Sequence, residues 1–343
     1  MAKKKNTPLK IFMESIGLYF SNFDKFVKYM TFPVLGQIFG LSLTFLLIYF
    51  YTKNMPIVIE KIPALANFST LVLIAILLIL PGMIIFIKAF WEYLVAYGAV
   101  NSMLENMLKS GKVYDFDAHT ELIKRRTFPF VGLWMLFGIF SLISIIPFFW
   151  VPCAVFAIYF VLVFQVFTFE PELSPLDCVK KSLQLIKGNF LSTFMLFALV
   201  GALTYVFIPQ LINIFSEYTR LTLLFTNLIK PMIVELPLVD VNAMLSYLYL
   251  KPLKVDDVAM FVVTTTLAQI FIQYTLPLRA ILWSMWYKKL NGGKLYINKE
   301  DKPKKKCSLK RPSEKLMEES NKKFATKKLD RNILKRAMEK DDE

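Results

Sequence analysis

The sequence predicts an all-α, polytopic membrane protein with six transmembrane helices, arranged as three units of a surface helix followed by a transmembrane hairpin. The first observation is composition: 56% of the 343 residues are hydrophobic, the mean hydropathy is +0.49, and the net charge is still +15. The second is that the lysines and arginines are crowded between long uncharged runs. This pattern excludes a disordered chain, a disulfide scaffold and an ordinary cytosolic enzyme.

The uncharged runs set the number of spans, because a bilayer core needs roughly 20 helical residues. They cover residues 29–52, 62–87, 127–169, 188–216 and 258–278. The run 127–169 is about two bilayer thicknesses long, and Pro147 and Pro152 interrupt it beside Trp150, an aromatic residue typical of the interface. We therefore expect a membrane domain over residues 1–298 with spans near 30–52, 67–91, 128–147, 150–169, 190–215 and 258–282.

Orientation follows from the positions of lysine and arginine. Positive residues gather before the first expected span, between the second and third, and between the fourth and fifth, whereas the loop 217–257 has more acids than cations. We therefore expect both termini on the cytoplasmic side of the membrane. Within the loop 217–257, an apolar helical stripe interrupted at Pro231 predicts helices on the outer leaflet, which either lid a cavity, hold a partner or simply cover the bundle.

A short motif precedes three of the expected spans. Ser15 and Asn22 match Ser182 and Asn189 at an offset of 167 residues, and Thr120 and Thr127 match more weakly at an offset of 105. The motif predicts amphipathic helices that begin at or near Ser15, Thr120 and Ser182, followed by turns where Asn22, Thr127 and Asn189 cap the membrane helices. Either the units are internal duplicates, or serine and asparagine flank apolar spans by chance.

The segment from Glu170 to Phe190, with Ser174-Pro175, Lys181-Ser182 and Lys187-Gly188, resembles a recurrent segment of bacterial multi-pass membrane proteins. That family is largely of unknown function and includes the membrane domain attached to some glycerophosphodiester phosphodiesterases. Leu80-Pro81-Gly82 and Ile145-Ile146-Pro147 are similar to turns of the same group, although Phe148 stands where glycine is usual. The resemblance implies a six-helix membrane module, which we expect in a bacterial-type inner membrane. Phosphodiesterase activity is not carried over, because the sequence shows no such catalytic domain.

Ionisable and amide side chains near the ends of spans two and six are the candidate polar cluster. They are Lys88, Glu92, Gln269, Gln273 and Arg279. In one interpretation they line a cavity for a substrate. In the other, which depth in the bilayer favours, Lys88 and Arg279 extend to the headgroups, Glu92 pairs with Lys88, and the glutamines bond to Gln37 or Gln165 of other spans.

Residues 299–343 form a basic cytoplasmic tail, which we expect to be partly helical or disordered. Its juxtamembrane cluster is predicted to contact anionic lipid headgroups through Lys304, Lys305, Lys306, Lys310 and Arg311. Nucleic acid is a poor candidate partner, because Phe324 is the one aromatic residue in this tail available for base stacking.

The sequence carries no recognisable catalytic motif. The single histidine, His119, has no cluster of metal-ligating residues around it, and Asn291-Gly292-Gly293-Lys294 lacks the spacing of a phosphate-binding loop. We therefore expect no enzyme activity, no cofactor and no metal. The favoured function is a membrane-organising or accessory module that contacts lipid or an envelope protein. The alternative is a small-solute or lipid transporter that uses the candidate polar cluster.

Overall fold

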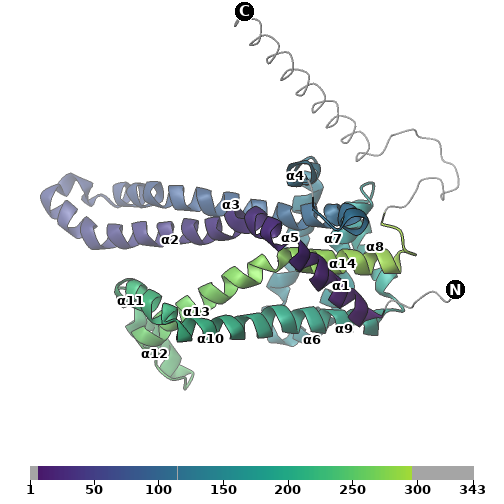
Figure 1. Cartoon of the computed structure of the whole chain (residues 1–343). Helices are drawn as coiled ribbons and strands as arrows, with labels where there is room; N and C mark the ends of the chain where they lie inside the picture. Colours follow the sequence, from purple (N-terminus) through teal and green to yellow (C-terminus); the bar gives the residue numbers. More distant parts are fainter. Residues whose placement is uncertain (1–6, 114, 296–343) are drawn as a thin grey trace, which may run out of the picture. The chain divides into compact units, whose positions relative to one another are not determined.

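A computed structural model describes residues 7–113 and 115–295, and within them the regular secondary structure is entirely helical (Figure 1). In chain order the elements are α1 (Pro8–Ser21), α2 (Phe23–Lys61), η1 (Pro63–Ala66), α3 (Phe68–Ser110), α4 (Phe116–Lys124), α5 (Thr127–Ile143), η2 (Pro147–Phe149), α6 (Trp150–Phe160), α7 (Val163–Phe169), α8 (Pro175–Ile186), α9 (Phe190–Gly201), η3 (Ala202–Phe207), α10 (Ile208–Tyr218), α11 (Leu221–Val234), α12 (Leu238–Tyr247), α13 (Val255–Tyr274) and α14 (Leu276–Leu290). The predicted tail contacts, Lys304, Lys305, Lys306, Lys310 and Arg311, lie outside the described residues.

Five helical stretches in the described part are long and apolar enough to cross a membrane. They are Phe23–Lys61, Phe68–Ser110, Pro147–Phe169, Phe190–Tyr218 and Val255–Tyr274. Two further pairs, α4 with α5 and α11 with α12, pass the same test only together, and they are bent by 78° and 87°. The all-helical class is therefore confirmed for the described residues, with five helices, or up to seven if each bent pair is one span, apolar enough to cross a membrane. The arrangement of six spans stays a prediction.

The third expected span ends earlier than predicted. Residues 128–147 were expected as one helix, but α5 is 17 residues long and ends at Ile143. The preceding helix α4 meets α5 at 78°, and this bend lies before the expected span. A helix of 17 residues rises about 26 Å, a little less than the apolar thickness of a bilayer.

The sixth expected span is also not one helix. Residues 258–282 were predicted as a single span, but α13 ends at Tyr274 and α14 begins at Leu276. The physical reason is Pro277, which has no backbone N–H to donate to the carbonyl of Gln273 four residues earlier and whose ring clashes with that carbonyl. The interruption that was expected at Pro231 does not occur: α11 continues through Pro231 to Val234.

Helices α2 and α3 form a long antiparallel hairpin (Figure 1) whose backbones touch. Gly36 and Gly40 are four residues apart and so lie on one face of α2. A Cβ on Gly40 would meet the backbone nitrogen of Phe86 at 2.6 Å and the carbonyl oxygen of Gly82 at 2.7 Å. Small residues at this seam allow the close approach, as in many membrane helix pairs.

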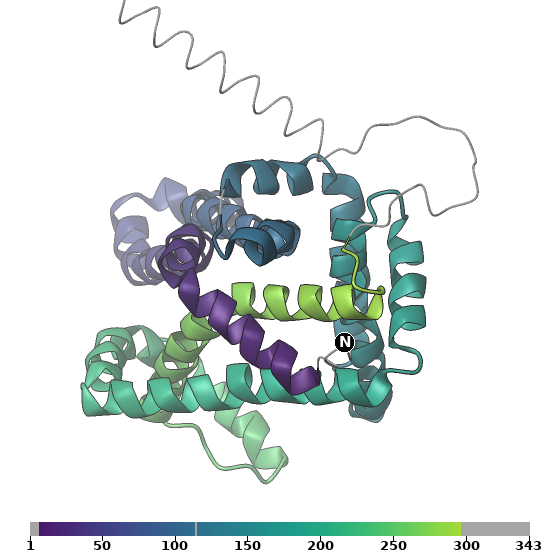
Figure 2. The same ribbon diagram turned by 45° about the vertical axis from the view of Figure 1, so that its right-hand side comes forward.

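Helix α14 is the centre of the hydrophobic core. It packs against α1, α3, α7 and α8, and α1 crosses it in Figure 2. Most of its fifteen residues are buried, including Trp286 and Tyr287. The indole Nε1 of Trp286 donates to the hydroxyl of Thr193 at 3.0 Å, so even the largest core side chain has a polar anchor.

Candidate functional site

The three residues predicted to begin the amphipathic helices lie inside them instead. Ser15, Thr120 and Ser182 are each at least four residues past the first residue of α1, α4 and α8. The side chains that accept the first-turn N–H groups are those of Thr7, Asp115 and Ser174. The prediction of these helix starts was therefore wrong, although Thr7 and Ser174 stand at the same offset of 167 residues.

Ser15 and Ser182 occupy equivalent buried positions despite that error. The hydroxyl of Ser15 donates to the carbonyl of Ile11 at 2.7 Å, and that of Ser182 donates to the carbonyl of Tyr159 at 2.6 Å. The buried faces of the two helices also correspond at this offset: Ile11, Ser15 and Tyr19 in α1, and Cys178, Ser182 and Ile186 in α8. A four-residue spacing puts each set on one helix face.

The residues predicted to cap the membrane helices stand at the helix starts, but their side chains do not cap them. Asn22 and Asn189 precede α2 and α9, but neither side chain makes a capping hydrogen bond. Asn22 instead holds the loop after α3, donating to the carbonyl of Gly111 at 3.0 Å and accepting from the N–H of Val113 at 2.9 Å. Thr127 is the first residue of α5 rather than its N-cap.

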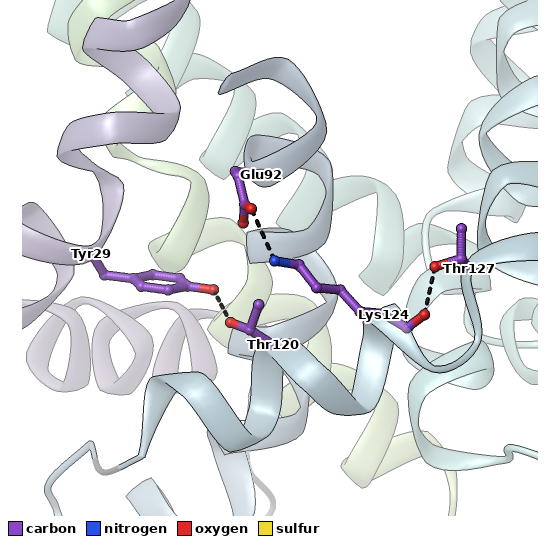
Figure 3. Close-up of polar contacts among 5 residues, drawn as sticks. All are labelled: Tyr29, Glu92, Thr120, Lys124 and Thr127. Atoms are coloured by element: carbon purple, nitrogen blue, oxygen red, sulfur yellow. Dashed lines mark hydrogen bonds and ion pairs between the residues drawn. The ribbon is translucent and has the colours of Figure 1, made fainter. Parts of the chain in front are cut away.

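Helix α4 is tied to its neighbours by the contacts in Figure 3. The hydroxyls of Tyr29 and Thr120 are 2.6 Å apart, which joins α4 to α2. Lys124 pairs with Glu92 of α3, with 2.9 Å between nitrogen and oxygen, and Thr127 donates to the Lys124 carbonyl at 2.5 Å. Glu92 is thus bound to the neighbouring helix, and its expected pairing with Lys88 was wrong.

The five residues of the candidate polar cluster do not converge. Among the described residues, no hydrogen bond or ion pair joins any two of them. Lys88 is exposed, with its ammonium 5.5 Å from the ring of Phe32. Gln269 is exposed, whereas Gln273 accepts from the side-chain amide of Gln37 at 3.3 Å, the partner that the sequence suggested.

Arg279 has a different environment from the one expected. It lies in the first turns of α14, where Nη1 donates to the hydroxyl of Tyr205 at 2.8 Å. Nη2 donates to the hydroxyl of Tyr93 at 3.2 Å and to the carbonyl of Ile272 at 3.4 Å. The guanidinium is therefore held between α3, η3 and the end of α13, rather than extended alone toward the headgroups.

Two features make this arginine unusual within the described residues. No carboxylate lies within ion-pair distance of it, and its Nε is buried without a hydrogen-bond partner. Buried cations are normally paired, because removing an ion from water is costly. The cluster of Arg279, Tyr93 and Tyr205 is rich in donors, so it can hold an anion.

Sequence reasoning missed the tyrosines and the partners of Gln165. Gln165 donates to the hydroxyl of Tyr97 at 3.1 Å and to Oδ1 of Asn101 at 3.3 Å, rather than bonding to the glutamines of the sixth expected span, and Ser284 donates to the same Oδ1 at 3.0 Å. Asn101 was detectable as an amide within apolar surroundings. Its partner Ser284 is 183 residues from it in sequence, and no local pattern reveals such a contact.

Burial favours the neutral forms of two titratable side chains on the short helices α4 and α8. Burial raises the pKa of the Cys178 thiol to about 11, so the thiolate is disfavoured. Burial also lowers the pKa of His119, against a weaker opposing effect of Asp115, and the imidazole Nδ1 lies 2.7 Å from the hydroxyl of Ser102. No group of three or more potential metal ligands occurs in residues 7–113 and 115–295.

Comparisons with protein-family models, curated proteins and solved structures find no match to this chain. The resemblance of the segment from Glu170 to Phe190 to bacterial multi-pass membrane proteins therefore stays a prediction.

Proposed function

We propose that this protein is a non-catalytic integral membrane protein with six spans and both termini in the cytoplasm, acting in an inner membrane as a membrane-organising or accessory module. The partners proposed for it are membrane lipid and an envelope protein. A relationship to the bacterial multi-pass family that the Glu170–Phe190 segment resembles is part of the same proposal.

The observation that carries this proposal is the distribution of apolar side chains. Long helices present large apolar residues outward, for example Phe39 and Phe45 on α2 and Leu77 on α3, all of them exposed. Exposed apolar surface on this scale requires an apolar solvent or a partner. The polar contacts supply support of another kind, because Glu92–Lys124, Gln37–Gln273 and Asn101–Ser284 each join two helices and so serve packing.

Reporter fusions test the topology of the proposal. A reporter whose activity depends on its side of the membrane is fused after Ser110, after Glu172, after Lys299 or after Asp240. We expect the first three fusions to report the cytoplasm and the fusion after Asp240 to report the outer side, since positive residues favour the cytoplasm. Extraction of the chain by alkaline carbonate, or a cytoplasmic signal after Asp240, would contradict the proposed spans.

A transporter is the second candidate, and the interruption between α13 and α14 favours it. Discontinuous helices commonly form the binding sites of transporters, and Gln273 and Arg279 flank this one. The test is a Gln273→Cys variant, compared with the parent chain so that its natural cysteines are subtracted. Labelling of the new thiol by a membrane-impermeant reagent from both sides in turn supports transport, and labelling from one side or neither favours the accessory module.

A further inference from the structure

We propose that Arg279, Tyr93 and Tyr205 form a binding site for the phosphate group of an anionic lipid headgroup. We call these three residues the arginine–tyrosine site. The inference rests on the proposed function, because it names the class of lipid that the membrane module holds and the place where it holds it. It is separate from the basic tail, which lies outside the described residues.

The first argument is the charge of Arg279. A guanidinium stays protonated in proteins, and within or near a membrane it is stabilised only by partners. Its partners in the described chain are neutral: two tyrosine hydroxyls and the carbonyl of Ile272. An anion is the missing counterpart, and the buried Nε without a partner shows that the chain itself does not satisfy all donors of this guanidinium.

The second argument is the donor inventory around the guanidinium. Both tyrosine hydroxyls accept from Arg279, so each keeps its own proton for a further bond. Among the described residues, neither of these protons is donated to another group. The arginine–tyrosine site therefore presents N–H and O–H donors together. Phosphate oxygens accept several such bonds at once, and the planar guanidinium matches a phosphate with two parallel bonds.

The third argument is the irregular backbone on two sides of the arginine–tyrosine site. Tyr205 lies in η3, a π-helical segment between α9 and α10, and π-helical turns are frequent at functional sites. Arg279 follows the interruption at Thr275, near the N-terminus of α14, where the helix dipole adds a positive potential. Two neighbouring elements thus depart from regular helix where the unpaired cation lies.

The fourth argument favours a lipid over a free phosphate ion. Tyr205 is 57% exposed, and its neighbours Val206 and Phe207 are 60% and 57% exposed. The accessible side of the arginine–tyrosine site is thus bordered by apolar surface. A ligand that carries acyl chains covers this border while its phosphate reaches Arg279, and a hydrated ion does not.

Lipid retention by the full chain tests the inference. The chain is reconstituted in nanodiscs of equal phosphatidylglycerol and phosphatidylcholine, and the lipids that stay bound are counted by native mass spectrometry. The variants are Arg279→Gln and Tyr205→Phe, with Lys88→Gln as the control that removes an exposed cation elsewhere. The tail is present in every variant, so its attraction for anionic lipid cancels.

We expect the parent chain and the Lys88→Gln control to retain phosphatidylglycerol preferentially. Arg279→Gln should reduce that preference by about tenfold, the size expected for losing a charge-assisted hydrogen bond. Tyr205→Phe should reduce it by a smaller factor. If Arg279→Gln fails to fold, Tyr205→Phe decides the question, because it keeps the ring and removes only the exposed hydroxyl.

Unchanged preference in the folded variants would overturn the site. If excess inorganic phosphate displaces the bound lipid, the arginine–tyrosine site binds phosphate groups but does not require a lipid, and that result would overturn the lipid as its ligand. A chain that is inserted as the reporters require, yet retains both lipids equally, fails the inference and leaves the proposed function standing. Failure of membrane insertion would instead remove the proposed function.

Discussion

The outer part of the α2–α3 hairpin, residues 39–87, and the core around α14 are stabilised in different ways. In the hairpin, two helices touch through glycines and present apolar side chains such as Phe45 outward. In the core, α14 is enclosed by several helices, and buried polar side chains of α14 such as Ser284 bond to neighbouring helices. The comparison teaches that the hairpin leaves apolar surface for an apolar solvent or a partner to cover, whereas α14 depends on packing within the chain.

The largest expected effect comes from the core. Trp286→Ala removes a fully buried indole and its hydrogen bond to Thr193, and leaves a cavity. We expect the free energy of unfolding in detergent to fall by about 3–5 kcal/mol. The control is Phe45→Ala in the hairpin, where a side chain that is 61% exposed should cost no more than about 0.5 kcal/mol. Equal losses in the two variants would remove the distinction between the regions.

The second prediction tests the glycine seam of the hairpin. Gly40→Ala places a methyl group against the backbone of Phe86 and Gly82, so the helices must separate. We expect the free energy of unfolding to fall by about 1–3 kcal/mol. Gly138→Ala is the matched control, because nothing lies within 4 Å of its added Cβ.

Helix propensity alone should make the Gly138→Ala variant more stable by up to about 1 kcal/mol. Both variants are compared by chemical unfolding in the same micelles. A gain in stability for Gly40→Ala similar to that for Gly138→Ala would show that the hairpin has room at this seam.

The smallest expected effect concerns pH. Burial lowers the folded-state pKa of His119 below 6.5, so the unfolded chain binds the proton first as pH falls. His119 therefore contributes stability that is present above pH 6.5 and is lost as pH falls through the lowered pKa. Thermal unfolding from pH 7.5 to 5 should show a steeper loss for the parent chain than for His119→Gln. Parallel curves would contradict this linkage.

The periodic part of the fold was accessible from sequence, because long uncharged apolar runs indicate helices. They do not give helix length, since α2 and α3 extend well beyond their runs to 39 and 43 residues. The offset of 167 residues also located equivalent faces of α1 and α8. The helix starts were misassigned although the signal was present: Thr7-Pro8 and Ser174-Pro175 each combine a capping residue with proline at the first helical position. Pro277 similarly carried the signal for the break after α13.

The environment of Arg279 was not accessible in this way. Tyr93 is 186 residues distant from it in sequence and Tyr205 is 74 residues distant, and both contacts depend on how α3, η3 and α14 pack. Depth in a span predicted an extended side chain, because that argument treats each helix alone. The packing of α3, η3 and α14 at the interruption gives Arg279 its two tyrosine partners. The spacing of polar residues along any one helix does not predict such a contact between helices.

The central place of α14 also has a consequence for the order of synthesis. Asn101 on α3 bonds to Ser284, which the ribosome adds 183 residues later. At about 5–20 residues per second, roughly 10–40 s pass before that partner emerges. During this interval Ser284 is not available to Asn101, and the core around α14 is open. The fold of the described residues therefore closes only when its last helix, α14, has been synthesised.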